Sequence, residues 1–425
     1  MIFNSPILQD LEWRGLIAQS TDANALDDYL CEDGATVYCG FDATSDSLTI
    51  GNLVALMTLF RFRMHGIRTI VLLGEATALI GDPSFRDSER DECGRTVILH
   101  NVHNFEQQVR KVFGTQEEPR DLLIRGNAQT FDRMSYTNFM MEIGRHVCIN
   151  DMLRRESMKQ RQDSGLTFAE LGYMVMQSLD FDELWRTEGC RVQIGGNDQW
   201  GNICAGIDLV RKRHQPEHPA LGMTVPLLTR ADGSKIGKSS GATVWLSEEK
   251  TSPWEFFNYW INLSDEEAIQ HAKWFLPLNI EATRSILDAA ADSDDPRSLQ
   301  KSLARQITSL LHGDETMQRC RRVSDALFNN DIQELDDNDI ATLNGHIPTV
   351  KISREHLDTI TGMLLEAKVA ASKRDARTLL DQGAISINGR LVRSVEDFSA
   401  KNLHLDKFAL IRRGKKNWHL AVVEE

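Results

Sequence analysis

Residues 38–53 read Tyr38-Cys39-Gly40-Phe41-Asp42-Ala43-Thr44-Ser45-Asp46-Ser47-Leu48-Thr49-Ile50-Gly51-Asn52-Leu53, and this stretch decides the fold. Residues 36–41 are rich in β-branched and aromatic side chains, which favours a buried strand. Residues 42–47 are turn and cap types, and apolar side chains then recur with helical spacing. A strand, a tight loop and a helix therefore follow one another, and the free N–H groups at the helix start offer a place for a phosphate. Such a passage serves as scaffold as often as it binds a ligand, and neither a Walker-type nor a Gly-x-Gly-x-x-Gly pattern is present.

A second informative stretch lies far downstream, at residues 229–240: Thr-Arg-Ala-Asp-Gly-Ser-Lys-Ile-Gly-Lys-Ser-Ser. Lys235 and Lys238 stand three apart among Gly and Ser. A cationic, glycine-rich loop suits a mobile clamp on a polyphosphate, and it suits a solvated surface loop equally well.

Taken together, the two stretches resemble the signatures of class I aminoacyl-tRNA synthetases. Residues 49–52 are similar to His-Ile-Gly-His, and residues 235–239 are similar to Lys-Met-Ser-Lys-Ser. Residues 193–202 (Gln-Ile-Gly-Gly-Asn-Asp-Gln-Trp-Gly-Asn) and the stretch around Tyr173 narrow the resemblance to bacterial-type tyrosyl-tRNA synthetases. The resemblance covers nearly the whole chain, including its C-terminal tail.

Composition sets the class of protein. The chain has 425 residues, of which 41% are hydrophobic and 26% charged, as in a soluble globular protein of two to four domains. No apolar run approaches the ~18 residues of a membrane span, and the N-terminus does not read as a signal sequence. The seven cysteines form no Cys-x-x-Cys pair, which indicates reduced thiols. We therefore expect a cytoplasmic protein without a membrane segment.

Charge is unevenly distributed along the chain. The net charge is −14, which argues against a general nucleic-acid coat. Residues 351–425 carry 14 Lys and Arg against 10 Asp and Glu, a net of +4, and this leaves −18 for the rest. An acidic body with a basic tail suits an enzyme that has a dedicated RNA-binding appendage.

The resemblance implies an α/β fold: a Rossmann-like nucleotide-binding domain with a parallel sheet, an α-helical domain and a small α+β RNA-binding domain. Arg68–Gly74 reads as a second buried strand, residues 95–165 as mostly helical, and Asn330–Lys351 as a polar, acidic region that contains a linker. The domains we expect are residues 1–232 (catalytic), 233–245 (mobile loop), 246–335 (helical, anticodon side), 336–351 (linker) and 352–425 (RNA-binding).

One helix carries a polar stripe. Tyr173, Gln177 and Asp180 are spaced i, i+4 and i+7, so they share one face, which is either a solvent face or the wall of a polar pocket. The resemblance implies a pocket: Tyr173 and Gln177 would bind the amino group of tyrosine, and Asp180 with Tyr38 would hold its phenolic hydroxyl. A phenylalanine would leave these buried groups unpaired, at a cost of kilocalories.

The resemblance assigns further binding residues. Asp82 would help to hold the substrate ammonium, and Asp82-Pro83 can begin a turn or a helix. Gln199 would reach the substrate carboxylate or the carbonyl of its adenylate. Arg86 and Arg90 would lie near the pyrophosphate, although pairing with Asp87 or Glu89 is the plainer interpretation. Asn127 is also expected at the tyrosine site. The nucleotide-binding residues we expect are Cys39, Gly40, Asp42, Gly51, Gly196, Asp198 and Ile236.

The implied chemistry has two steps, tyrosine adenylation by ATP and tyrosyl transfer to the 3′ end of tRNA(Tyr). No side-chain nucleophile is needed, so catalysis is positioning and charge stabilisation. Mg²⁺ would come with ATP through its phosphate oxygens. The catalytic residues we expect are Thr44, Thr49, Asn52, Arg86, Lys235 and Lys238, with Thr44 and Thr49 donating to phosphates.

The sequence departs from the family at two places. Thr49 stands where relatives usually have His, and Thr130 ends Asn-Ala-Gln-Thr where relatives have Asn-Tyr-Asp-Trp. These departures leave two alternatives open: a divergent paralogue that adenylates a tyrosine-like amino acid for another acceptor, and an inactive RNA-binding protein.

The tail is expected to bind RNA. A basic helix from Ser372 leads into a hairpin closed by Asn388-Gly389, a strong turn signal. Lys373, Arg374 and Arg377 would contact phosphates, or form a solvated charged face. The family resemblance also implies a homodimer, with an interface in the region that contains Phe131, Met134, Phe139, Met140 and Met141, although core packing explains these residues as well.

Overall fold

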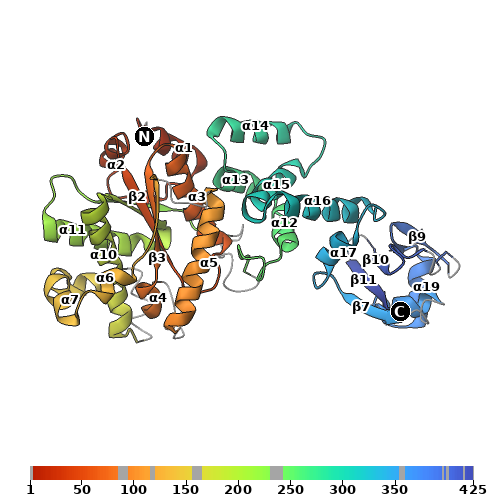
Figure 1. Ribbon diagram of the computed structural model, residues 1–425. Coiled ribbons are helices and arrows are strands. Elements are labelled where there is room, and N and C mark those ends of the chain that lie inside the picture. The colour runs from red at the N-terminus through yellow and green to blue at the C-terminus, as the bar shows by residue number, and fades with distance from the viewer. Residues whose placement is uncertain are drawn as a thin grey trace. The chain divides into compact units, whose positions relative to one another are not determined.

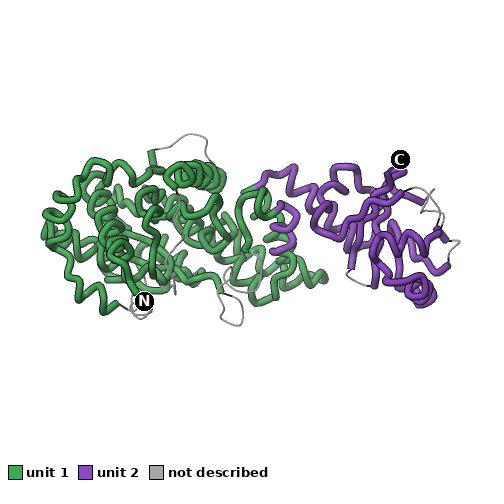
Figure 2. The backbone as a smooth tube through the Cα atoms, turned by 90° about the horizontal axis from the view of Figure 1, so that it is seen from below, with its two compact units in different colours: residues 1–251, 260–311 green, residues 252–259, 312–425 purple. Residues whose placement is uncertain are grey.

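The computed structural model describes residues 3–84, 94–114, 120–155, 165–229, 243–353, 359–394, 397–398, 402–414 and 417–424. The chain divides into two compact units (Figure 2). The first contains Met1–Thr251 and Trp260–Leu311, and the second contains Ser252–Tyr259 and His312–Glu425. No helix among the described residues is long and apolar enough to cross a membrane.

A six-stranded sheet forms the centre of the first unit (Figure 1), with the order β1-β6-β5-β2-β3-β4. Strand β1 pairs antiparallel with β6, and the other neighbours are parallel. The chain builds β2, β3 and β4 outward in one direction and then returns to place β5 on the other side of β2. The strands are β1 (Gln19–Ser20), β2 (Thr36–Asp42), β3 (Arg68–Gly74), β4 (Leu122–Gly126), β5 (Val192–Gly196) and β6 (Leu221–Val225).

Helices cover both faces of this sheet (Figure 1). Helix α3 (Ile50–Met64) and helix α5 (Arg95–Phe113) pack on one face, and α10 (Phe168–Glu188) with α11 (Trp200–His214) packs on the other. Because the order of strands reverses between β2 and β5, the carboxyl ends of these two strands open a crevice, where ligands of such sheets bind. The remaining elements of this part are α1 (Pro6–Arg14), α2 (Ala23–Leu30), α4 (Ala76–Ile80), α6 (Ala128–Asp132), α7 (Tyr136–Glu142), η1 (Gly144–His146), α8 (Ile149–Leu153) and η2 (Asn197–Gln199).

The elements predicted from residues 36–60, 68–74 and 168–178 are present, and the last is longer than predicted. Helix α10 begins at a capping box, in which Thr167 and Glu170 exchange side-chain and backbone bonds, and it runs on to Glu188. The prediction that residues 95–165 are mostly helical was incomplete, because Leu122–Gly126 forms strand β4. Among the described residues this strand pairs only with β3, at the edge of the sheet. Four of its five residues are half-exposed, so it lacks a buried strand's apolar run.

Helices α12 (Pro253–Ile261), α13 (Asp265–Phe275), α14 (Ile280–Ala291) and α15 (Ser298–His312) follow. Two buried arginines tie α13 to the sheet part of the first unit. Arg14 donates to the carbonyls of Lys273 and Leu278, and Arg61, in α3, donates to those of Lys273 and Leu276. These carbonyls lie at the C-terminal end of α13, where a helix leaves its last acceptors unsatisfied and favours cations.

The second unit contains a five-stranded sheet of order β7-β11-β10-β8-β9. Residues 388–389 join β8 to β9 with positive φ angles of 45° and 84°, which confirms the predicted hairpin turn. The helices are α16 (Asp314–Asn329), α17 (Asp337–Leu343), α18 (Ile360–Glu366) and α19 (Lys373–Asp381). The strands are β7 (Thr349–Ser353), β8 (Ile385–Ile387), β9 (Arg390–Val392), β10 (Phe408–Arg413) and β11 (Asn417–Glu424).

The linker predicted at residues 336–351 is instead structured. It contains helix α17 and the start of β7, which pairs with β11. The acidic run that suggested a linker supplies a capping box, in which Asp336 accepts from the Asp339 amide, and Asp339 also pairs with Arg322. Ile340 and Leu343 are buried in a core cluster with Leu410 and Leu420, so acidic residues here cap and anchor a helix.

Candidate active site

A cavity of about 540 Å³ opens at the carboxyl ends of β2, β3 and β5. Every predicted tyrosine-site, nucleotide-site or catalytic residue that the structure describes lines this cavity: Tyr38, Cys39, Gly40, Asp42, Thr44, Thr49, Gly51, Asn52, Asp82, Asn127, Tyr173, Gln177, Asp180, Gly196, Asp198 and Gln199. Arg86, Lys235, Ile236 and Lys238 lie outside the described residues. The prediction from the sequence therefore selected residues that are up to 161 positions apart and that line one cavity in the structure. Their individual roles are still predictions.

One end of the cavity is formed by Tyr38, Asp180 and Gln193, which lie close together. All three are buried, and the Tyr38 hydroxyl and Gln193 Oε1 have no hydrogen-bond partner within the described structure. Burial raises the pKa of Tyr38 well above its usual value, and the neighbouring Asp180 carboxyl raises it further. Burial likewise raises the pKa of Asp180, although a hydrogen bond from Asn127 opposes this. Unpaired buried polar groups are costly, so this end of the cavity suits a ligand that carries a hydroxyl.

A chain of hydrogen bonds holds the Asp180 carboxyl in place. Asn127 Nδ2 donates to Asp180 Oδ2 at 2.9 Å and to Thr77 Oγ1 at 3.1 Å, and Thr77 in turn donates to Asp42 Oδ1 at 2.8 Å. The Tyr173 hydroxyl donates to the other Asp42 oxygen at 2.7 Å. Thr77 and Gln193 were not predicted, and the sequence signal for each is weak, because each is a single polar residue in an apolar element.

A second polar group lies at the side of the cavity. Gln199 Nε2 donates to Asp82 Oδ2 at 2.7 Å, and Gln177 Nε2 donates to Gln199 Oε1 at 3.3 Å. Gln177 donates one amide N–H to Gln199, and its buried Oε1 has no partner among the described residues. Asp82 and Gln177 therefore present acceptor oxygens, which suit an ammonium group.

The mouth of the cavity suits a nucleotide. Gly196 ends β5, and a Cβ added there would lie 2.7 Å from Asp198 Oδ1, so a side chain at this position would displace the Asp198 carboxyl from the strand end. On the opposite side, α3 begins with its N-cap at Thr49. The Ile50 N–H donates to Val244 O at 3.0 Å, so the last residues of the loop predicted at 233–245 pair with the start of this helix. Gly51 and Asn52 line the cavity between these two walls.

Replacing Tyr38 by Phe is expected to stabilise the ligand-free protein. The substitution removes a buried hydroxyl that has no partner in the described part of the chain, so the free energy of unfolding in urea should rise by about 1 kcal/mol. The matched control is Tyr29→Phe, because the Tyr29 hydroxyl accepts from Thr36 N at 2.7 Å and donates to Thr36 O. That variant should lose about 1 kcal/mol. Equal effects in both variants would contradict this account of the cavity.

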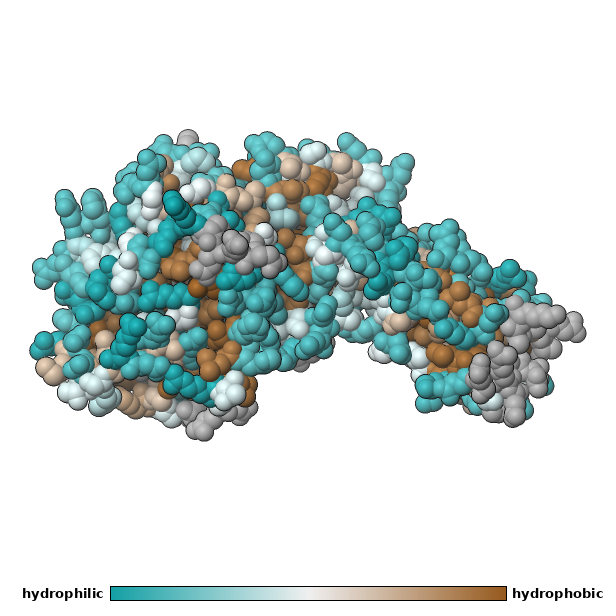
Figure 3. Space-filling model, in the orientation of Figure 1, coloured by the Kyte–Doolittle hydropathy of each residue, from teal (hydrophilic) through white to brown (hydrophobic). Residues whose placement is uncertain are grey.

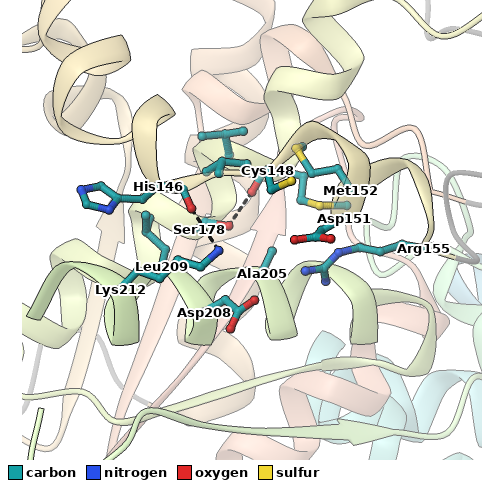
Figure 4. A pocket seen from close by; sticks show the side chains of 13 residues that line it. His146, Cys148, Asp151, Met152, Arg155, Ser178, Ala205, Asp208, Leu209 and Lys212 are labelled. Atoms are coloured by element: carbon teal, nitrogen blue, oxygen red, sulfur yellow. Dashed lines mark hydrogen bonds between the residues drawn. The ribbon is translucent and has the colours of Figure 1, made fainter. Parts of the chain in front are cut away.

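Two further hollows lie in the same unit. The smaller, of about 30 Å³, lies beneath α8 and is lined by side chains that include Cys148, Asp151, Ser178 and Lys212 (Figure 4). Its Lys212 donates to His146 O at 3.1 Å, and its volume has room for about one water molecule. The larger, of about 440 Å³, borders α6, α7 and α10, and its Asp182 and Glu183 both pair with arginines.

Comparison with known proteins agrees with this geometry. The family model described as tRNA synthetases class I (W and Y) matches residues 32–329, and that of the tyrosine–tRNA ligase SYY-like C-terminal domain matches residues 339–421. The tyrosine–tRNA ligase of Bacillus caldotenax is 39% identical over 415 residues, which is 97% of this chain and 99% of that protein. The tyrosine–tRNA ligase of Lactobacillus acidophilus is 37% identical over 420 residues, covering 98% and 99%.

A solved structure is similar as well. A C-terminally truncated mitochondrial tyrosyl-tRNA synthetase from Aspergillus nidulans superposes with a TM-score of 0.68 at 25% identity, covering 76% of this chain and 94% of that chain. The match in sequence extends over both units of the chain, and the match in structure extends over most of it. The chain belongs to the tyrosyl-tRNA synthetase family of class I aminoacyl-tRNA synthetases.

Proposed function

We propose that this chain is a tyrosine–tRNA ligase, which activates tyrosine with ATP and transfers the tyrosyl group to tRNA(Tyr). The observation that carries this proposal is the closed end of the cavity, where the Tyr38 hydroxyl and the Asp180 carboxyl are buried together. A phenol that enters there gives Tyr38 a partner and uses Asp180 Oδ1, because Asn127 already bonds Oδ2. Phenylalanine offers neither bond, which gives selectivity for tyrosine.

The other polar groups of the cavity lining would take the remaining parts of tyrosyl adenylate. Asp82 and Gln177 would take the ammonium, and Gln199 would lie beside the carboxylate that attacks the α-phosphorus of ATP. Asp198 would accept from the ribose hydroxyls next to Gly196. MgATP is the expected form of the nucleotide, with the ion on phosphate oxygens, since the start of α3 offers amide donors that suit phosphate. The protein's own contribution is to align the two reactants and to stabilise charge on the phosphates.

Tyrosine-dependent exchange of pyrophosphate into ATP, measured without tRNA, tests the first step, and charging of purified tRNA tests the second. Exchange with tyrosine followed by charging is the expected result. Exchange without charging would replace the proposal by an activating paralogue that has another acceptor. No exchange with any amino acid would overturn the enzymatic proposal and leave RNA binding.

The basic face of α19 is proposed to bind tRNA. Lys373, Arg374 and Arg377 are exposed, while Ala376 and Leu379 on the opposite face are buried in the core of the second unit. Replacing the three cations by Ala should weaken tRNA binding by about tenfold or more and lower its salt dependence, because each contact to phosphate releases counterions. Pyrophosphate exchange without tRNA should not change. A variant that binds tRNA normally would leave these cations as a solvated face.

A homodimer is also proposed, with an interface over α7. Met140 and Met141 are exposed, as is Tyr136 at 68%, and Figure 3 shows side chains of intermediate hydropathy at the lower left, over α7. Phe131, Met134 and Phe139, for which an interface and core packing were both open, pack partly buried against a core cluster. Sedimentation of the full chain tests the dimer. Localisation in the cytoplasm is proposed with the same function.

A further inference from the structure

The hydroxyl of Thr49 is already engaged within the protein. Thr49 Oγ1 donates to Asn52 Oδ1 at 2.8 Å, and it accepts from the Asn52 N–H at 3.4 Å. Its single hydrogen therefore points at Asn52 rather than into the cavity. The expectation that Thr49 donates directly to a phosphate of ATP does not agree with this geometry.

The same contacts fix the orientation of the Asn52 amide. Asn52 Oδ1 accepts from the Thr49 backbone N–H at 3.0 Å as well as from its hydroxyl. A backbone N–H can only donate, so the reversed amide would place an NH₂ group against it. Asn52 Nδ2 must therefore point away from Thr49, and Asn52 is a half-buried residue of the cavity wall.

Few donors remain at this end of α3. The Ile50 N–H is used by Val244 O, and the Asn52 N–H is used by Thr49 Oγ1. Within the described part of the chain, the Gly51 N–H and Asn52 Nδ2 have no partner. Both residues line the cavity, so these are the donors that this helix start offers to a ligand.

We infer that Thr49 is a positioning residue, which holds the Asn52 amide so that its NH₂ group donates to an oxygen of ATP during amino-acid activation. The inference rests on the proposed function. It explains how a short, neutral threonine serves at this place: the side chain acts through Asn52 and need not reach the nucleotide itself.

A double-mutant cycle tests this inference, with Thr49→Val, Thr49→Ser, Asn52→Ala and the double variant T49V/N52A. In tyrosine-dependent pyrophosphate exchange, Asn52→Ala should lower kcat by about 30-fold and Thr49→Val by about tenfold, with the KM for tyrosine unchanged. Thr49→Ser keeps the hydroxyl and should stay within about twofold of the original rate. In the double variant, Thr49→Val should cost almost nothing further, because the group that it positions is absent.

The matched control is Thr58→Val in the same helix. The Thr58 hydroxyl donates to Val54 O at 2.8 Å and does not line the cavity, so this variant should keep its kcat. A tenfold loss from Thr49→Val in the Asn52→Ala background would overturn the inference and make Thr49 a direct donor. Equal losses from Thr49→Ser and Thr49→Val would also overturn it.

The dissociation constant of ATP, measured by calorimetry over the same variants, separates this inference from the proposed function. If the unmodified protein shows no exchange with any amino acid, the proposed function fails, and the cycle in ATP affinity still decides whether Thr49 and Asn52 act together. If exchange occurs, and the effects of the Thr49 and Asn52 substitutions are additive both in kcat and in the dissociation constant of ATP, the proposed function stands and the inference fails.

Discussion

Replacing Asp180 by Leu should abolish the preference for tyrosine over phenylalanine. Asp180 is buried at the closed end of the cavity, and its Oδ1 is the acceptor available to a phenolic hydroxyl. Leucine removes that acceptor and leaves the phenol unpaired in an apolar wall. The lost hydrogen bond and the unpaired phenol each cost about 2 kcal/mol, and together they correspond to a fall of about 10³ in kcat/KM for tyrosine. Activation of phenylalanine should not fall, because phenylalanine never used the carboxyl.

The helix that carries Asp180 supplies its own control. Asp182 is equally buried but pairs with Arg213 and His214, outside the cavity. Asp182→Leu should lower stability and leave the tyrosine-to-phenylalanine ratio of kcat/KM unchanged. Asp180→Leu should not lower stability, because burial raises the pKa of this carboxyl and its charged form is costly in the empty cavity. Pyrophosphate exchange with both amino acids, and urea unfolding of both variants, give the comparison. A ratio that changes equally in the two variants would contradict the assignment of Asp180.

Acid should destabilise the protein through His271. This residue of α13 is 1% exposed and packs against Trp260 and Phe275, with ring centroids 6.0 and 5.4 Å away. Neither ring nitrogen has a hydrogen-bond partner within the described structure. Burial lowers the pKa of His271 from 6.5 to about 4. The nearby charge of Glu267 favours the imidazolium, but burial outweighs it, so the folded protein keeps the ring neutral.

The direction of the effect follows from proton binding. Between pH 6.5 and about 4 the unfolded chain protonates His271 while the folded chain does not, so acid favours unfolding. A shift of this size corresponds to about 3 kcal/mol, fully present above pH 6.5 and lost as the pH falls to about 4. His271→Phe should remove this contribution to the pH dependence of urea unfolding, whereas replacement of the exposed His218 by Gln should not. If the free energy of unfolding of His271→Phe depended on pH as in the unmodified protein, the aromatic cluster would have to accept a charged imidazolium.

Much of the site could be predicted because its residues carry local patterns. The β2–α3 passage combines strand, cap and helix signals, and the stripe of Tyr173, Gln177 and Asp180 is regular. Thr77 and Gln193 could not be predicted, since each acts through a partner that only the tertiary structure supplies: Thr77 bridges Asp42 and Asn127, and Gln193 lies beside Tyr38 in adjacent strands. The role of Thr49 depends on the rotamer of Asn52, which no spacing rule gives.

Strand β4 and helix α17 were missed for a related reason. Both are short, and tertiary pairing rather than a strong local pattern stabilises them: β4 lies at a sheet edge, and α17 is anchored by Ile340 and Leu343. The composition of such a segment reflects the many side chains that face solvent. Whether it forms a strand or a helix depends on a few buried contacts with distant parts of the chain.

The arginine contacts at the end of α13 affect the order in which the chain assembles during synthesis. Arg14 lies 259 residues before Lys273, and Arg61 lies 215 residues before Leu276, whose carbonyls they bind. A nascent chain that has completed the whole sheet can bond Arg14 to Asp10 and Arg61 to Met57 O, but the remaining N–H groups of both guanidinium groups still lack these carbonyls. Contacts of such high sequence separation form late and slow folding. The sheet is therefore incomplete as a folding unit until about residue 278 has left the ribosome, and a fragment cut before that point would have to bury both charges without those carbonyl partners.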